Sequence, residues 1–410
     1  MNLYIFNESR RGSVYGVGTY IRELSAALKG SDTNVCVVNI ASDKPQIQFD
    51  EIEGIRNWHI PAPIEEQRTI EDQKIRELYY CNVVYLLQLH IEDKTNLVFH
   101  LNYNQCGSLA EELKNVFDCR IVAVVHFTDW SFKIYDNLQR LRDILNEERQ
   151  DSFEVNLKKS FEKDKSYYLK VDRIICLSNY MQEILCRDYG IDVTKISIIA
   201  NGLPDLIDAV ADKKFLRKKW NIPTGEKIIL FAGRVDEVKG VSFLIKAFRE
   251  VLSRYVDCRL IIAGSGDYDV FFREAKDICT KVTFTGLLEK NELHEIYQIA
   301  DVGVVPSLFE MFGYVPVEMM MYGLPIVATA TSGLNEVVDD TCGFKIPIIE
   351  YPDRIEVDTD LLAEKIIYLL QNPAEARAIG QNGRKRYLQE YTVEVFRTNM
   401  VQFYKSLFAE

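Results

Sequence analysis

Two cations in the second half of the sequence lie where a phosphate-binding loop is expected. Arg234 and Lys239 belong to a glycine-flanked loop directly after the apolar run 227–232. Arginine can hold phosphate with a fork of donors, and lysine supplies a compact charge. The pair therefore indicates a site for a phosphorylated ligand. The alternative is a solvated turn in which these cations only pair with Asp236 and Glu237.

Two carboxylates follow a second apolar run, at 302–305. Glu310 lies in the loop after this run, and Glu318 lies in a helix that Pro316 can begin. Side chains at these positions could bind the hydroxyls of a ribose and a sugar. Together with the two cations they indicate a polyhydroxylated diphosphate ligand. The alternative is that Glu318 only favours the positive end of its helix and Glu310 is solvated.

Two glycine pairs resemble parts of nucleotide-binding motifs. Gly16 and Gly18 open a helix whose first backbone amides can attract phosphate, and Gly264 and Gly266 follow a strand candidate. The dinucleotide-binding fingerprint needs a third glycine three residues further on, and both pairs lack it. This argues against an NAD-dependent dehydrogenase.

The elements that must position these residues alternate between strand and helix. In the second half, strands are predicted at 227–232, 259–263, 281–284, 302–305 and 325–328, and helices from Ser242, at 290–300 and at 315–322. This alternation predicts right-handed crossovers and a parallel sheet. Ligands of such sheets bind beyond the carboxyl ends of the strands, where the loops described above lie.

The first half alternates less regularly. Strands are predicted at Leu3–Phe6, Val35–Ile40, Leu97–Leu101, Ile121–Val125 and Arg173–Leu177, and helices at 17–29, 68–92 and 134–170. A polar stretch follows Pro204. We therefore expect an α/β protein with two doubly wound domains, residues 1–204 and 205–391.

The composition is that of a globular protein. The 410 residues include 49 basic and 61 acidic side chains, for a net charge of −12, and 47% are hydrophobic. This balance excludes a disordered chain or a fibre and argues against a nucleic-acid partner. The nine cysteines contain no Cys-x-x-Cys pair, which argues against a zinc site. With no signal peptide or long apolar run in the sequence, we expect a cytoplasmic protein.

The motifs of the second half, in their order, resemble a known family. Gly-Arg-x4-Lys-Gly from 233, Ala-Gly-Ser-Gly from 263, Glu-x7-Glu from 310 and Gly-Leu-Pro from 323 are similar to the C-terminal domain of family-4 retaining glycosyltransferases. The first half matches more loosely, through Gly16, Gly18, His126, Ser178 and Asn201. The resemblance implies the GT-B architecture, with two Rossmann-like domains facing each other across a cleft and a last helix, 392–410, crossing back to the first domain.

The resemblance also implies roles for residues of the second half. Arg234 and Lys239 match the pair that contacts the diphosphate of a nucleotide-sugar and stabilises it as it leaves. Glu310 matches the glutamate beside the donor sugar, and Glu318 the one that holds the ribose hydroxyls. The remaining positions expected to bind the donor in this half are Gly233, Gly264 and Gly313.

In the first half, Gly16 and Gly18 match a loop whose amides approach the phosphates. His126 falls where a histidine commonly lines the catalytic centre, and the alternative is a packed histidine at a strand end. Two departures from the family leave the acceptor open: Tyr15 replaces a usual glycine, and the segment 131–170 has no clear template.

The resemblance implies transfer of a sugar from a nucleotide-sugar to an acceptor hydroxyl with retention, without metal or cofactor. UDP-sugars are the default donors and GDP-mannose comes next. The acceptor could be a glycan, a lipid-linked glycan or a peptide. The alternatives are a GT-B nucleotide-sugar epimerase and a non-catalytic partner that binds sugar nucleotides.

One basic segment could contact a membrane. Residues 157–170 hold five lysines interleaved with Phe161, Tyr167, Tyr168 and Leu169. Such a basic, amphipathic face can bind weakly to anionic lipid at the inner face of a membrane. The more favoured alternative is an ordinary solvated helix face.

Overall fold

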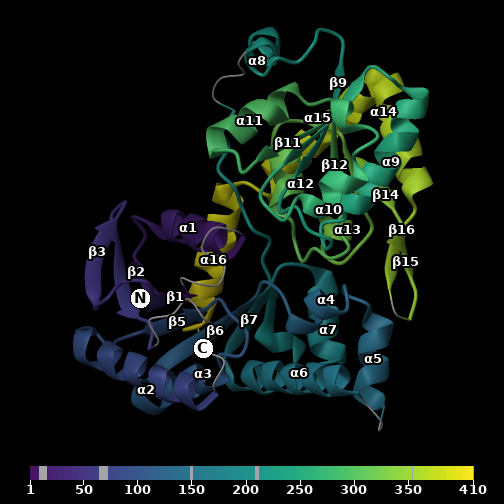
Figure 1. The fold of residues 1–410 in the computed structure, drawn as a ribbon. Coiled ribbons are helices and arrows are strands. Elements are labelled where there is room, and N and C mark those ends of the chain that lie inside the picture. Colours follow the sequence, from purple (N-terminus) through teal and green to yellow (C-terminus); the bar gives the residue numbers. More distant parts are fainter. Residues whose placement is uncertain (9–15, 64–72, 148–150, 208–211, 353, 410) are drawn as a thin grey trace. The chain divides into compact units, whose positions relative to one another are not determined.

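The computed structural model describes residues 1–8, 16–63, 73–147, 151–207, 212–352 and 354–409 (Figure 1). Their contacts divide the chain into two compact units. Unit 1 comprises Met1–Trp130, Arg142–Gly202 and Val393–Glu410, and unit 2 comprises Ser131–Leu141 and Leu203–Thr392. Both ends of the chain thus belong to unit 1, and each unit is built from more than one stretch of sequence.

Unit 1 is built on an eight-stranded sheet in the order β3-β4-β2-β1-β5-β6-β7-β8. Its strands are β1 (Asn2–Glu8), β2 (Asn34–Ser42), β3 (Gln48–Ile52), β4 (Ile55–Pro61), β5 (Leu97–Leu101), β6 (Cys119–Val125), β7 (Arg173–Cys176) and β8 (Ile196–Ile198). All neighbours run parallel except β3 and β4. The order reverses at β1 and β5, which is the switch point where doubly wound sheets bind ligands.

The β3–β4 hairpin is an element that the sequence analysis did not predict. Its two-residue turn is Glu53-Gly54, and Ile52 pairs with Ile55. Both turn residues have positive φ, 52° and 79°. This conformation gives the backbone twist that a tight hairpin needs, and glycine at the second position favours it.

His100 lies at the centre of the core of unit 1, on β5. Its side chain is fully buried, and its two ring nitrogens lie 3.2 Å from the Tyr20 hydroxyl and 2.8 Å from the Tyr404 hydroxyl. Tyr20 comes from α1 (Gly16–Leu28) and Tyr404 from α16 (Val393–Ser406). Burial, with a smaller contribution from His126, lowers the pKa of His100 to about 3. A neutral histidine therefore joins the last helix to the sheet.

Unit 2 contains a six-stranded parallel sheet in the order β11-β10-β9-β12-β13-β14. The strands are β9 (Lys227–Ala232), β10 (Cys258–Ala263), β11 (Val282–Gly286), β12 (Val302–Val305), β13 (Ile326–Thr329) and β14 (Gly343–Ile346). This is the strand order of a Rossmann fold, with its switch point between β9 and β12. The five strands predicted for this half are confirmed to within two residues at each end.

Helices cover both faces of this sheet. On one face, α9 (Val241–Arg254) and α14 (Thr359–Gln371) share a core with Val302 and Val304. On the other, α12 (Tyr314–Met321) packs on α15 (Pro373–Glu390). Gly303 faces α12, because a Cβ added there would overlap the sulfur of Met319. The alternation of Val302, Gly303 and Val304 thus sets how closely α12 approaches the sheet.

Two predicted helices need correction. The segment 134–170 is not one helix: α5 (Leu138–Asn146) ends before α6 (Ser152–Lys170), where Asp151 and Glu154 form a capping box. The helix predicted from Ser242 begins at Val241, with Gly240 as its N-cap. The helix predicted at 68–92 is α2 (Gln73–His90), and residues 68–72 lie outside the described residues.

The aromatic side chains expected on a membrane-facing surface lie in the core of unit 1. Phe161, Tyr167 and Tyr168 of α6 are buried, and Phe161 stacks on Tyr189 with ring centroids 4.0 Å apart. Only Leu169 of that set is exposed. Membrane contact therefore stays a prediction that rests on the lysines alone. Within the part of the chain that the structure describes, no helix combines the length and apolar character needed to cross a membrane.

The buried neutral histidine makes the stability of the protein depend on pH. Below its ordinary pKa of about 6.5, His100 binds a proton in the unfolded chain but not in the folded one, so stability falls as the pH drops from about 6.5 towards 3. Between pH 7 and pH 5 the wild-type protein should lose roughly 1–2 kcal/mol of unfolding free energy through this group. The variant His100→Gln cannot titrate at this position, so its loss over the same range should be smaller by that amount. Urea unfolding followed by tryptophan fluorescence at the two pH values measures this, and equal losses would contradict it.

Candidate active site

The loops after β9 and β12 lie against each other at the switch point of unit 2. The amide of Leu308 donates to the carbonyl of Val238 at 2.8 Å. Gly240 lies so close to the second loop that an added Cβ would overlap the carbonyl oxygen of Pro306. Its φ of +70° also suits glycine. These backbone contacts bring the predicted cations and carboxylates to one edge of the sheet.

Asp236 organises the loop after β9. Its Oδ1 accepts the backbone amide of Lys239 at 2.9 Å, and its Oδ2 lies 3.1 Å from Nη2 of Arg234. One carboxylate thus shapes the turn and holds the first of the two predicted cations. The sequence indicated Asp236 only as a charge partner of the cations. It did not reveal that Asp236 also accepts a hydrogen bond from the backbone of the turn.

Lys239 and Glu310 form an ion pair between the two loops. Both side chains are about four-fifths buried, with 20% and 21% exposed. The structure therefore brings together two residues that were predicted from separate motifs. An ammonium and a carboxylate in contact, both still reachable from solvent, are suited to exchange partners when a charged ligand enters.

Glu318 lies on α12, beyond the N-cap residue Gly313. Its Oε2 accepts the hydroxyl of Tyr297 at 2.7 Å. Tyr297 belongs to α11 (Lys290–Ile299), and its ring stacks on that of Tyr322 with centroids 5.7 Å apart. Tyr297 could not be predicted from the sequence, because no pattern links it to a carboxylate twenty-one residues away. A carboxylate has about four acceptor sites, so the hydrogen bond from Tyr297 does not by itself exclude ligand hydroxyls from Glu318.

The glycines predicted to bind the donor also have a structural reason to be glycine. A Cβ on Gly264 would overlap the carbonyl oxygen of Gly233, so the loops after β9 and β10 touch through their backbones. The amide of Gly233 in turn donates to the carbonyl of Ala263 at 2.9 Å. Their roles in donor binding stay predictions, since close packing alone explains these two residues.

The predicted residues of unit 1 lie around its own switch point. Gly16 and Gly18 are in the first turn of α1, and Tyr15 lies outside the described residues. His126 follows β6, and its Nε2 lies 3.0 Å from Oδ1 of Asn102, which follows β5. The amide nitrogen of Asn102 donates to the carbonyl of Phe6, so its Oδ1 accepts and Nε2 of His126 carries the proton.

His126 is a neutral, weakly basic group. Burial lowers its pKa to about 3, and the ring of Tyr20 packs edge-on against it with centroids 4.6 Å apart. It is only partly buried, so the imidazole remains reachable at the surface of unit 1. Asn102, which orients it, was not found from the sequence. A polar residue directly after a central strand is the signal that could have indicated it.

Among the residues that the structure describes, no group of three or more histidine, cysteine, aspartate or glutamate side chains could hold a metal ion.

The family models match both halves of the chain. The model described as Glycosyltransferase Family 4 matches residues 14–205, and that described as Glycosyl transferases group 1 matches residues 212–386. Together with the two Rossmann-like sheets, these matches identify a glycosyltransferase with the GT-B fold. The chain belongs to the family-4 glycosyltransferases.

Three curated relatives are similar over half of the chain or more. A D-inositol 3-phosphate glycosyltransferase from Xylanimonas cellulosilytica is 27% identical, with 81% of this chain and 79% of its own length aligned. An α-D-kanosaminyltransferase from Streptomyces kanamyceticus is 25% identical over 52% of this chain and 54% of its own. An uncharacterized glycosyltransferase from Methanocaldococcus jannaschii is 29% identical over 57% and 60%. The aligned regions therefore span between about half and four-fifths of these relatives.

Solved structures share the fold over almost the whole chain. A sucrose-phosphate synthase from Thermosynechococcus elongatus has a TM-score of 0.79 at 22% identity, covering 100% of this chain and 99% of that one. HepE from Anabaena, in complex with UDP-glucose, has a TM-score of 0.69 at 17% identity, covering 99% and 100%. At this identity the likeness concerns the fold.

The close approach of the two loops at the switch point can be tested at Gly240. We expect Gly240→Ala to lower the free energy of unfolding by at least about 2 kcal/mol, because the new methyl group displaces the carbonyl of Pro306 as well as straining the backbone. Thermal unfolding of the variant measures the loss.

Gly286→Ala is the matched control. Gly286 has nearly the same φ, +75°, but nothing lies within 4 Å of an added Cβ. It should therefore show the backbone strain alone, about 1 kcal/mol. Equal losses in the two variants would mean that the contact with Pro306 does not constrain the loop.

Proposed function

We propose that this chain transfers a sugar from a nucleoside diphosphate sugar to an acceptor hydroxyl, with retention of the anomeric configuration and without a divalent metal. The observation that carries the proposal is the cation pair, Arg234 and Lys239, that Asp236 orders beside Glu310 at the switch point of unit 2. Diphosphates bind at this position in Rossmann-like sheets.

The chemical demand of the reaction fits this cation pair. As the bond between the anomeric carbon and the diphosphate oxygen breaks, positive charge develops on the sugar and negative charge on the leaving diphosphate. Two cations already in place stabilise this negative charge without reorganisation. In the proposed mechanism Arg234 and Lys239 take the role that a divalent metal has in other glycosyltransferases.

Donor binding is proposed to exchange the ion pairs seen in the structure. Lys239 turns from Glu310 to the diphosphate, and Arg234 adds its fork of donors. Glu310 is then available to accept hydrogen bonds from the sugar hydroxyls. Glu318, held by Tyr297, accepts the ribose hydroxyls, so the two carboxylates bind opposite ends of the donor.

Retention is proposed to follow from attack on the face that the leaving group occupies. The acceptor oxygen forms its bond to the anomeric carbon as the bond to the diphosphate breaks, and the departing phosphate oxygen takes the acceptor proton. This removes the need for a protein base. His126 suits the same scheme, because an imidazole with a pKa of about 3 is a poor proton acceptor and serves better as a polar contact for substrate.

The donor is proposed to be a UDP-sugar, with GDP-mannose as the next candidate. Support comes from HepE, which was solved with UDP-glucose, and from a relative in Corynebacterium glutamicum whose name describes it as GDP-mannose-dependent. The acceptor is proposed as a glycan, a lipid-linked glycan or a peptide. A panel of nucleotide-sugars, scored by donor hydrolysis and by thermal shift, tests the donor class.

Removing either cation should slow the chemical step. We expect Arg234→Ala and Lys239→Ala to lower turnover at saturating donor by about 10²- to 10³-fold, the usual scale for the loss of one stabiliser of developing charge. Steady-state release of the nucleoside diphosphate measures it. Lys246→Ala, at an exposed position of α9, is the control and should keep wild-type turnover. Near-wild-type turnover of both loop variants would contradict the role of Arg234 and Lys239 in stabilising the leaving diphosphate.

Metal independence and retention can be measured on one reaction mixture. We expect full activity in excess EDTA, equal to that in EDTA saturated beforehand with Mg²⁺, because the two cations supply the charge stabilisation. Proton NMR of the first product formed should show the anomeric configuration of the donor. Activity that EDTA abolishes and Mg²⁺ restores contradicts the metal-free mechanism, and an inverted product contradicts retention.

A further inference from the structure

Unit 2 contains a cationic cavity at the edge of the sheet opposite the proposed donor site. Its lining includes Lys227 at the start of β9, Asp301 just before β12 and Pro325 just before β13. These are the amino ends of the strands, whereas the loops of the candidate active site leave the carboxyl ends. The cavity has a volume of about 530 Å³, within the range of small-molecule sites.

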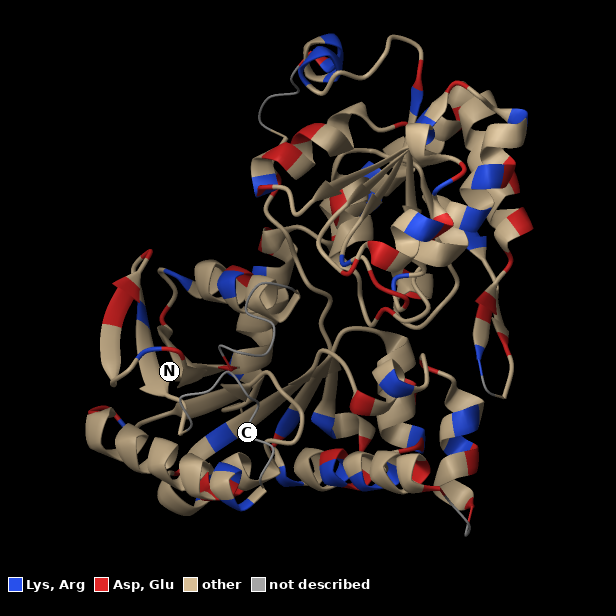
Figure 2. Cartoon of the chain, viewed as in Figure 1, with Lys and Arg blue, Asp and Glu red and all other residues tan. Residues whose placement is uncertain are grey.

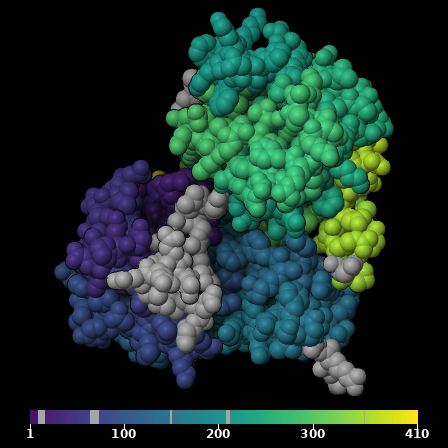
Figure 3. Space-filling view, viewed as in Figure 1, coloured from purple at the N-terminus to yellow at the C-terminus, as the bar shows by residue number. Residues whose placement is uncertain are grey.

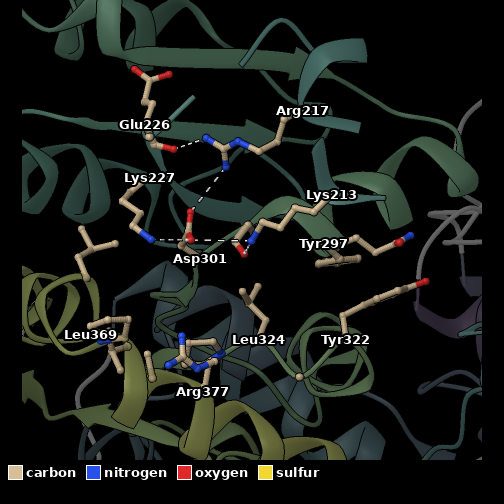
Figure 4. Close-up of a pocket in the computed structure, with 18 residues that line it drawn as sticks. Lys213, Arg217, Glu226, Lys227, Tyr297, Asp301, Tyr322, Leu324, Leu369 and Arg377 are labelled. Atoms are coloured by element: carbon tan, nitrogen blue, oxygen red, sulfur yellow. Dashed lines mark hydrogen bonds and ion pairs between the residues drawn. The ribbon is translucent and has the colours of Figure 1, made fainter. Parts of the chain in front are cut away.

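Cations outnumber carboxylates in this cavity. Lys213, Arg217 and Lys227 converge on Asp301, with nitrogen–oxygen distances of 3.8, 3.9 and 3.1 Å (Figure 4). Arg377 of α15 adds a fourth cation. The other carboxylate in the lining, Glu226, pairs with Arg259 and Lys281, which are not part of the lining.

Asp301 is already satisfied by its nearest donors. Besides Lys227 at 3.1 Å, the amide of Ile228 donates to its Oδ2 at 2.9 Å. Lys213 and Arg217 lie beyond hydrogen-bond distance of this carboxylate, so they contribute charge that one aspartate does not balance. Burial is the main cause that lowers the pKa of Lys213; Asp301 raises this pKa, and Arg217 and Lys227 lower it by less.

The helix that contributes two of these cations is itself strongly basic. The seven residues of α8 (Lys213–Lys219) include five lysines and arginines, which appear as a concentration of blue in Figure 2. In the space-filling view α8 lies on the surface of unit 2, in teal (Figure 3). Its charge would attract anions toward the cavity.

The remaining wall of the cavity is apolar and aromatic. Leu324, Leu369 and the rings of Tyr297 and Tyr322 line it (Figure 4). Cations on one side and apolar carbon on the other match a ligand with a phosphate at one end and a carbon skeleton at the other. We propose that this cavity binds a small soluble phosphate ester, and that its occupancy changes the affinity of the donor site for nucleotide.

The route of coupling is short. Tyr297 belongs to the lining, although its side chain is almost completely buried, and it donates its hydroxyl to Glu318, the residue proposed to hold the donor ribose. Tyr322, stacked on Tyr297, directly follows α12, the helix that carries Glu318. A ligand that packs against the partly exposed Tyr322 thus restrains Tyr297 and, through its hydroxyl, the carboxylate of Glu318. The coupling rests on the proposed function, whereas the binding of a phosphate ester in the cavity does not.

Binding is tested with the full chain by isothermal titration calorimetry. The probes are inorganic phosphate and fructose 1,6-bisphosphate, with fructose as the uncharged control. We expect the bisphosphate to bind, and Arg377→Glu to weaken it at least tenfold, since a charge-assisted contact is lost and repulsion replaces it. Arg377 is exposed, so the variant should fold, and its thermal unfolding checks this.

Two control variants locate the binding. Lys385→Glu reverses another exposed charge on the same helix, and Lys239→Ala removes a cation of the proposed donor site. Both should bind the bisphosphate within twofold of wild type. Binding that Lys239→Ala abolishes and Arg377→Glu leaves intact would overturn the proposal, as would the absence of binding. Sedimentation with phosphatidic acid vesicles that Arg377→Glu abolishes would reassign the cavity to a lipid headgroup.

Coupling is tested by titrating UDP with and without saturating bisphosphate. We expect UDP to bind about fivefold more tightly when the cavity is filled, a modest coupling for two sites joined by one side chain. Tyr297→Phe keeps the ring but removes the hydroxyl, so it should still bind the bisphosphate and lose the change in UDP affinity. An unchanged UDP affinity in wild type would overturn the coupling. A chain that binds the bisphosphate but no nucleotide would contradict the proposed function instead.

Discussion

The site of unit 2 depends on one constraint, the contact between backbones of neighbouring loops. Gly240 touches the carbonyl of Pro306, and Gly264 touches that of Gly233, at distances that no Cβ allows. These contacts join the three loops into one rigid edge. They place Lys239 beside Glu310, which lowers the entropy that two long side chains lose when they form one ion pair.

The positions of strands could be predicted from the sequence where burial on both faces produces a continuous apolar run. Strands β9 and β12 are covered on both faces, so each appears as an uninterrupted apolar run whose end also marks the start of a functional loop. Residues that act through distant partners were not predictable in this way. Tyr297 and Asn102 contact Glu318 and His126 only through the fold, and local spacing does not encode such pairs.

Polar groups in unit 1 show how a hydrophobic interior accommodates hydrogen-bonding side chains. His100 and His126 lie on or after neighbouring strands and both remain neutral, because burial disfavours their charged forms. The cations that we assign to ligands lie in unit 2, some at the carboxyl ends of its strands and others at the amino ends. The net charge of −12 therefore does not reveal the proposed sites, which depend on where individual lysines and arginines lie.

The division of the chain into units also has a consequence for the order in which the protein folds during synthesis. Unit 1 needs α16 to complete its core, since Phe396, Met400 and Tyr404 are buried there. The ribosome makes these residues after the whole of unit 2. Unit 2 can therefore fold while His100 still lacks the hydroxyl of Tyr404. Unit 1, whose first strands are made before unit 2, completes its core after unit 2.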